Sequence, residues 1–269
     1  MKKILVLDLD GTLTNHKKEI TPKTKAAIME MQKQGHTVVL ASGRPTRGVD
    51  PIRKELELDR YDGYTLAFNG ARITRCSTNE VIYQQTLPEE IVPELFAMAK
   101  QEGIGMMTYD EQGIVANRHE DEFMDIEAMI NQVQIRHFDD PTAHLTQPVN
   151  KCLGTAPVDI APAIEKKFYD RFSDRINVSR SEAFFIELVP KGVDKAASLA
   201  KLCEILGRSR DDMIACGDGF NDISMIEFAG LGVAMENAQE PVKKVADYIT
   251  RSNEEDGVAH VIHKYILAS

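Results

Sequence analysis

The chain has 269 residues, 43% of them hydrophobic, which is enough for one large or two modest domains with packed cores. Its formal net charge of -10 disfavours polyanionic partners, and its basic residues are too scattered to form a patch, so we expect no nucleic-acid partner. No apolar run approaches about 18 residues, so we also expect no membrane span and a cytoplasmic protein.

Apolar runs that end in polar residues alternate with helical segments along the chain. The first run, 4–8, ends in Asp8 and predicts a strand buried on both faces. Thr21 can cap the next helix, which has Pro22 at its first position. Strands joined by helices imply a parallel, doubly wound, Rossmann-like sheet. Its other elements are predicted as strands at 37–41, 65–68, 213–216 and 231–235, and as helices over 194–206 and from Asn221 onward.

The segment from 83 to 191 has a different pattern. It holds helical candidates and alternating strand-like stretches, but no polar residues gathered at strand ends. We therefore predict an α/β protein in which a core domain, 1–82 and 192–269, carries an inserted α/β domain over 83–191. The inserted helices are expected at 88–102 and 161–172, and two of its strands at 176–179 and 183–189.

Polar residues follow several of the predicted core strands directly. Because ligands bind at the carboxyl ends of parallel strands, these residues should share one crevice. They are Asp8, Asp10, Ser42, Gly43, Asp218, Asn221 and Asp222. Carboxylates crowded there would repel one another by about 4 kcal/mol per pair at about 4 Å, in a medium of dielectric constant near 20. Positive charge must offset this, and Mg²⁺ together with Lys195 would supply it.

Four short motifs give the chain a family resemblance. Asp8-Leu9-Asp10-Gly11-Thr12-Leu13, Ala41-Ser42-Gly43-Arg44, Lys195 and Gly217-Asp218-Gly219-Phe220-Asn221-Asp222 resemble the ordered motifs of the haloacid dehalogenase-like phosphatases. Asn69-Gly70-Ala71, the segment 232–238 and the segment 256–259 resemble the Cof-type subgroup, in which a large α/β cap lies between the second and third motifs. The resemblance thus implies that the inserted domain is this cap.

The resemblance implies a role for each acidic residue. Asp8 would attack phosphorus and form an aspartyl-phosphate, while Asp10 protonates the leaving alcohol and later deprotonates water. Mg²⁺ would be bound by Asp8 and Asp218, and by Asp10 through its backbone carbonyl. Asp222 would hold the metal ligands in position without binding Mg²⁺ itself.

The resemblance also implies how the phosphoryl group and the rest of the substrate are held. Its oxygens would be bound by Ser42, Gly43, Lys195, Asn221 and the backbone N–H of Leu9. Arg44 could extend this phosphate contact or be a salt-bridged loop residue. Arg180 and Glu187, late in the inserted domain, are candidate substrate contacts. The partner would be a small phosphorylated metabolite, such as a sugar phosphate or a nucleotide or cofactor phosphate, bound by a monomer or homodimer.

Three other functions share parts of this pattern. A phosphomutase of related fold would use the same two aspartates but return the phosphoryl group to sugar. A response-regulator receiver uses an acceptor aspartate, a lysine and Mg²⁺, but typically lacks the second acid and the cap. A non-catalytic phospholigand-binding protein would gain nothing from Asp8, whose charge repels the ligand.

Overall fold

The computed structural model describes residues 2–117 and 121–268, which form two compact units. The core unit comprises 1–83 and 194–269, and the inserted unit comprises 84–193. These boundaries lie one and two residues from the domain boundaries expected from the sequence. Each unit has its own buried hydrophobic cluster or clusters.

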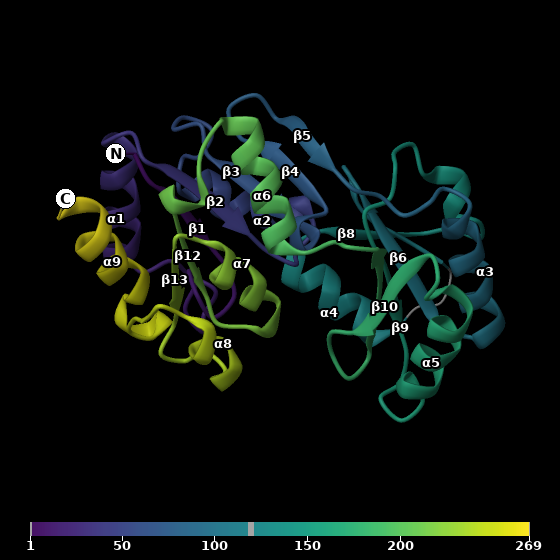
Figure 1. Ribbon diagram of the computed structural model, residues 1–269. Coiled ribbons are helices and arrows are strands. Elements are labelled where there is room, and N and C mark those ends of the chain that lie inside the picture. The colour runs from purple at the N-terminus through teal and green to yellow at the C-terminus, as the bar shows by residue number, and fades with distance from the viewer. Residues whose placement is uncertain (1, 118–120, 269) are drawn as a thin grey trace. The chain divides into compact units, whose positions relative to one another are not determined.

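Within the described residues, the core unit contains an eight-stranded sheet in the order β14-β13-β12-β1-β2-β3-β4-β5 (Figure 1). The strands from β14 to β3 are parallel, and β4 pairs antiparallel with β3. At the centre, Ile4 pairs with Met213 on one side and with Thr37 on the other. The bounds are β1 Ile4–Leu7, β2 Thr37–Ala41, β3 Tyr64–Ala67, β4 Arg72–Arg75, β5 Glu80–Gln84, β12 Met213–Gly217, β13 Leu231–Ala234 and β14 Tyr248–Ile249.

Helices cover both faces of this sheet. Helices α1 and α9 pack together on one face, and α6, α7 and α8 lie along the other (Figure 1). All four residues of β1 are fully buried, as expected of a strand covered on both faces. The bounds are α1 Pro22–Lys33, α2 Thr46–Glu55, α6 Lys195–Leu206, α7 Ile223–Phe228, α8 Glu240–Val245 and α9 Gly257–Ile262. The predicted doubly wound parallel core is confirmed.

Some core elements differ from the sequence-based prediction. Helix α2 was not predicted, because Pro51 lies inside it and helix-interior prolines normally end a helix. The β4–β5 hairpin was also missed. The strand expected at 65–68 ends at Ala67, because Phe68 has a left-handed φ of 54°. Thr21 caps α1 as predicted, and its side chain accepts a hydrogen bond from the Thr24 N–H.

The inserted unit is built on a six-stranded, mostly antiparallel sheet in the order β10-β11-β9-β6-β7-β8, counted over its described residues. Helices α3 and α5 pack with Met106 and Ile186 in one cluster, whereas α4 packs with the neighbouring Met107 and Phe185 in another. Because side chains alternate across a strand, the helices cover opposite faces of the sheet. The bounds are α3 Ile91–Glu102, α4 Glu122–Asn131, α5 Ala161–Phe172, β6 Gly105–Asp110, β7 Gly113–Ala116, β8 Gln134–His137, β9 Cys152–Thr155, β10 Ile176–Arg180 and β11 Phe185–Pro190.

This unit matches the sequence in part. Helix α5 has the predicted bounds, and α3 begins three residues later than expected. Strand β11 starts two residues late, and α4 and four of the strands were not predicted individually. Among the described residues, no helix has both the length and the apolar character needed to cross a membrane.

Candidate active site

Several of the predicted site residues lie together at the carboxyl ends of the central core strands. Asp8 directly follows β1, Ser42 follows β2 and Asp218 follows β12. Strands β2, β1 and β12 are adjacent and parallel, so their ends lie at one edge of the sheet. Three predicted motifs thereby meet because of strand order, although one is more than 170 residues from the others in sequence.

Lys195 connects two of the carboxylates. Its ammonium nitrogen lies 2.8 Å from Oδ1 of Asp8 and 2.6 Å from Oδ1 of Asp222. A third hydrogen bond of 2.9 Å reaches the backbone carbonyl of Ala41. The lysine side chain has no exposed surface, because it stands at the first position of α6 and points into the core unit. All three ammonium protons are thus donated within the protein.

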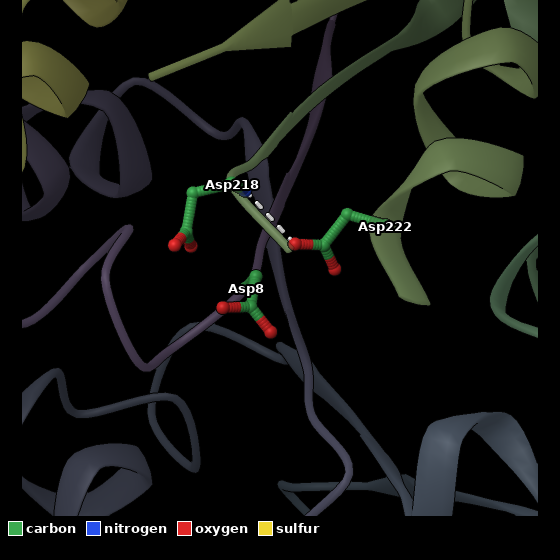
Figure 2. A group of neighbouring side chains, drawn as sticks. All are labelled: Asp8, Asp218 and Asp222. Carbon is green, nitrogen blue, oxygen red and sulfur yellow. Dashed lines mark hydrogen bonds between the residues drawn. The ribbon is translucent and has the colours of Figure 1, made fainter. Parts of the chain in front are cut away.

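Asp222 fixes the loop that carries Asp218. Its Oδ1 accepts from Lys195, and its Oδ2 accepts from the backbone N–H groups of Asp218 and Gly219, both at 2.9 Å. Figure 2 shows the bond to the Asp218 N–H as a dashed line. Both oxygens of Asp222 are therefore already engaged, which suits a supporting residue better than a direct metal ligand.

Asp8, Asp218 and Asp222 offer oxygens that all lie within 4.8 Å of one another (Figure 2). Thr12 donates to Oδ1 of Asp218 at 2.7 Å and so fixes that carboxylate. Gly11 lies so close that a Cβ there would be 2.3 Å from Oδ2 of Asp218, and its φ of 85° also requires glycine. The predicted metal set included the backbone of Asp10. The carboxylate cluster contains Asp8 and Asp218 of that set, together with Asp222.

The electrostatics of the cluster favour an added cation. Burial raises the pKa of Asp8 from 3.8 to about 8, and the charges of Asp222 and Asp218 add to this against the opposing effect of Lys195. Burial likewise raises the pKa of Asp218 to about 6. Three acidic groups face one lysine in a desolvated site. Oxygen donors with unbalanced negative charge fit a hard divalent cation.

Asp10 is held by two cations on the same unit. Arg44 grips it with two hydrogen bonds, from Nε at 2.8 Å and from Nη2 at 2.6 Å, and the Lys18 ammonium lies 2.6 Å from Oδ1. Burial alone would raise the pKa of Asp10, but the hydrogen bonds and charge of Arg44, followed by those of Lys18, lower it. Arg44 therefore forms the salt bridge that was the alternative to a substrate contact. The contact between Lys18 and Asp10 was not predicted. Its only signal in the sequence is the separation of eight residues between them.

The other predicted phosphate-binding residues have partners within the core unit. The Ser42 hydroxyl accepts from the backbone N–H of Arg44 at 3.1 Å. Leu9 is fully buried next to Asp8, and its carbonyl accepts from Thr14. Asn221 donates from Nδ2 to Oδ1 of Asn69 at 3.0 Å, and Gly43 lies against the same asparagine. Asn69 was noted in a family motif but given no role.

The two candidates from the inserted unit already have partners there. Arg180 donates to Glu165 of α5 at 2.6 Å. Glu187 accepts from Lys151, and although burial opposes it, the charge of Lys151 lowers the pKa of Glu187. In the β10–β11 pair, Arg180 lies opposite Ile186 and Glu187 opposite Ser179, so the two side chains are on opposite faces of the sheet. A role in substrate binding stays a prediction for both.

Comparison with known proteins matches this fold and site. A family model described as haloacid dehalogenase-like hydrolase matches residues 5–262. The crystal structure of a haloacid dehalogenase-like hydrolase from Bacteroides thetaiotaomicron is 46% identical, with a TM-score of 0.95 over 98% of this chain and 99% of that one. The 5-amino-6-(5-phospho-D-ribitylamino)uracil phosphatase YitU of Bacillus subtilis (strain 168) is 31% identical over 265 residues, 97% of each chain.

A solved structure of the sugar phosphatase BT4131, from subclass IIB of the same superfamily, is 25% identical with a TM-score of 0.80, covering 98% of this chain and 99% of that one. The chain therefore belongs to the haloacid dehalogenase-like hydrolases, in their Cof-type group. Within that family it is a hydrolase of phosphoric monoesters.

The raised pKa of Asp8 gives a prediction about stability without metal. When a carboxyl group has a higher pKa in the folded state than in the unfolded state, the folded protein loses stability as the pH rises from the lower pKa to the higher one. For Asp8 these pKa values are 3.8 and about 8. Asp8→Asn removes that loss. In a chelator, the gain in free energy of unfolding from the unmutated protein to Asp8→Asn, whether positive or negative at pH 5, should be at least about 1 kcal/mol larger at pH 8 than at pH 5.

Chemical denaturation at both pH values measures the gain. Asp159→Asn is the matched control, because Asp159 is exposed in the inserted unit and lies outside the carboxylate cluster. A gain for Asp8→Asn that does not change with pH would contradict the electrostatic description of the site.

Proposed function

We propose that the protein is a Mg²⁺-dependent phosphatase that hydrolyses small phosphomonoesters through an aspartyl-phosphate on Asp8. One observation carries the proposal: Asp8 stands at a strand end, anchored by the buried Lys195 and beside the carboxylate of Asp218. A carboxylate held in place by a cation, at a site built to receive a second cation, is suited to nucleophilic attack on phosphorus.

The chemical steps follow from the positions of Asp8 and Asp10. An oxygen of Asp8 forms a bond to phosphorus as the ester P–O bond breaks, and Asp10 gives its proton to the leaving alkoxide. Water then attacks the phosphorus of the acyl phosphate while Asp10 takes its proton. Orthophosphate leaves and the Asp8 carboxylate is restored. Lys195 holds Oδ1 of Asp8 at 2.8 Å and so limits rotation of the nucleophile.

Asp10 must change partners during this cycle. Arg44 and Lys18 favour its ionised form, which is the form that takes a proton from water. To donate a proton to the leaving group, the carboxyl must first be protonated, and both cations oppose that. Turnover therefore requires the two hydrogen bonds from Arg44 to Asp10 to weaken when substrate is bound. Protonation of the leaving group then depends on substrate binding.

The residues that would hold Mg²⁺ are the carboxylates of Asp8 and Asp218 and the backbone carbonyl of Asp10. This oxygen donor set leaves room for waters and a phosphate oxygen, as Mg²⁺ prefers. When bound, the ion supplies positive charge against the developing negative charge of the phosphoryl oxygens. Asp222 holds the Asp218 backbone and Lys195 in place.

The names of the relatives support a substrate class. One relative is a phosphatase of a 5-phospho-D-ribityl compound, and one structural neighbour is a sugar phosphatase. Both names describe a phosphate ester on a polyhydroxylated carbon chain. We accordingly place sugar phosphates and ribityl-type cofactor phosphates first among the substrates, ahead of nucleotides.

Phosphate release from a panel of phosphomonoesters tests this function. Sugar and polyol phosphates should have the highest values of kcat/KM, and aryl phosphates lower ones. Asp8→Asn should reduce release from every substrate by at least about 10⁴-fold, because an amide is no nucleophile at phosphorus. A folded Asp8→Asn variant with near-normal turnover would reject the aspartyl-phosphate route, and a panel led by nucleotides would reject the substrate class.

Metal removal tests the cation site. Chelation should abolish phosphate release, and Mg²⁺ should restore it in a saturable way. Asp218→Asn should raise the Mg²⁺ concentration for half-maximal activity by about tenfold or more, because one charged ligand is lost. Asp159→Asn, the exposed control, should leave that concentration unchanged. Full activity in the presence of excess chelator would rule out the metal.

A further inference from the structure

We propose that Asn69 is a positioning residue for phosphate binding, which acts by holding the side-chain amide of Asn221. Asn69 lies in a left-handed turn, Phe68–Gly70, that directly follows β3. The inference rests on the proposed function, in which Asn221 binds phosphoryl oxygens. It adds a fourth strand end to the site, since β3 follows β2 in the order of the sheet.

The backbone of this turn is unusual. Phe68, Asn69 and Gly70 have φ values of 54°, 55° and 99°, so three consecutive residues are left-handed. Residues with a Cβ rarely adopt the left-handed backbone region, and a bulky residue such as Phe68 adopts it least readily. Such a conformation persists only where the surrounding structure imposes it, and it is found disproportionately at functional sites.

Hydrogen bonds from two motif-bearing segments impose the conformation. The backbone N–H of Phe68 donates to the carbonyl of Arg44, and that of Asn69 donates to the carbonyl of Ser42, both at 2.9 Å. On the other side, the Ser198 hydroxyl donates to the Gly70 carbonyl at 2.6 Å. Ser198 lies one turn after Lys195 on α6. The turn is thereby fastened to the loop after β2 and to the helix that carries the lysine.

The side chain of Asn69 extends the connection to the fourth motif. Its Oδ1 accepts from Nδ2 of Asn221 at 3.0 Å. The same oxygen lies where it would be 3.2 Å from a Cβ at Gly43, so Gly43 has no room for a side chain without a shift of Asn69. Asn221 uses one of its two amide hydrogens on Asn69, which sets the plane of the amide and the direction of its remaining hydrogen and oxygen.

Asparagine meets both demands of this position. It is among the residues with a side chain that adopt the left-handed region most readily, and it supplies a neutral hydrogen-bond acceptor. Glycine would accept the backbone conformation but offer no acceptor. Aspartate would offer an acceptor but add a negative charge beside the anion site. The backbone and the side-chain contact can therefore be separated by substitution.

A double-mutant cycle with Asn69→Gly and Asn221→Ala tests the inference. Asn69→Gly keeps the left-handed turn and removes only the acceptor, so the melting temperature should stay close to that of the unmutated protein. We expect kcat/KM for p-nitrophenyl phosphate to fall by about tenfold, the effect of one well-placed hydrogen bond. In the Asn221→Ala background the same substitution should cause no further loss, because its target is gone.

The matched control is Asn79→Gly. Asn79 is also a left-handed asparagine of the core unit, with φ of 58°, and its amide oxygen accepts from Arg53. This variant should leave kcat/KM unchanged. A loss for Asn69→Gly that adds fully to that of Asn221→Ala, or no loss at all, would overturn the inference. So would a loss that merely follows a lowered melting temperature.

Binding of inorganic phosphate in the presence of Mg²⁺, measured by calorimetry on the same five proteins, separates this inference from the proposed function. Asn69→Gly should weaken phosphate binding, again with no further effect in the Asn221→Ala background. Coupled phosphate binding without turnover would support the positioning role and reject the phosphatase mechanism. Turnover by the unmutated protein, together with phosphate binding in which the two substitutions act independently, would support the phosphatase mechanism and reject the positioning role.

Discussion

The candidate active site depends on one buried ammonium group. Lys195 joins the nucleophile candidate Asp8, the loop-fixing Asp222 and the backbone at the end of β2, and its side chain is fully enclosed. Removing one partner of a buried ion pair typically costs several kcal/mol, because the other charge is left without compensation. The lysine therefore binds three loops to one another as well as supplying charge. Its charge does not balance Asp8, Asp218 and Asp222 together, and that imbalance leaves a place for a divalent cation.

The order of strands in the core sheet brings the parts of this site together. Strands β2, β1 and β12 are neighbours, while the inserted unit of 84–193 separates the second motif from Lys195 in sequence. The inserted unit begins after Tyr83 and ends before Asp194. The core sheet tolerates an insertion of that length because no central strand is interrupted. The hydrogen bonds and ion pairs that join Asp8, Lys195, Asp218 and Asp222 to their neighbours lie within the core unit alone.

Much of this site could be predicted from the sequence, for identifiable reasons. The carboxylates follow apolar runs, and a run such as β1 is a strong local signal of a buried parallel strand. Lys195 has no local signature of its own. It was proposed because the carboxylates need positive charge, and the family resemblance then added a phosphate-binding role. The ion pairs of Asp10 with Arg44 and Lys18 depend on how two loops fold, which no periodicity encodes. The turn at Phe68 was mistaken for the end of a strand, because its left-handed backbone is imposed by hydrogen bonds from distant segments.

Two opposing demands meet in this core. In the mechanism we propose, Asp8 must stay ionised although burial raises its pKa, and Asp10 must sometimes carry a proton although two cations favour its charged form. A crystal structure with Mg²⁺ and beryllium trifluoride, a mimic of the phosphoryl group, tests the account most directly. The account predicts beryllium bonded to an oxygen of Asp8, Mg²⁺ on the carboxylates of Asp8 and Asp218, and Lys195 still between Asp8 and Asp222. A mimic bound elsewhere, or Lys195 turned away from Asp8 in that complex, would contradict it.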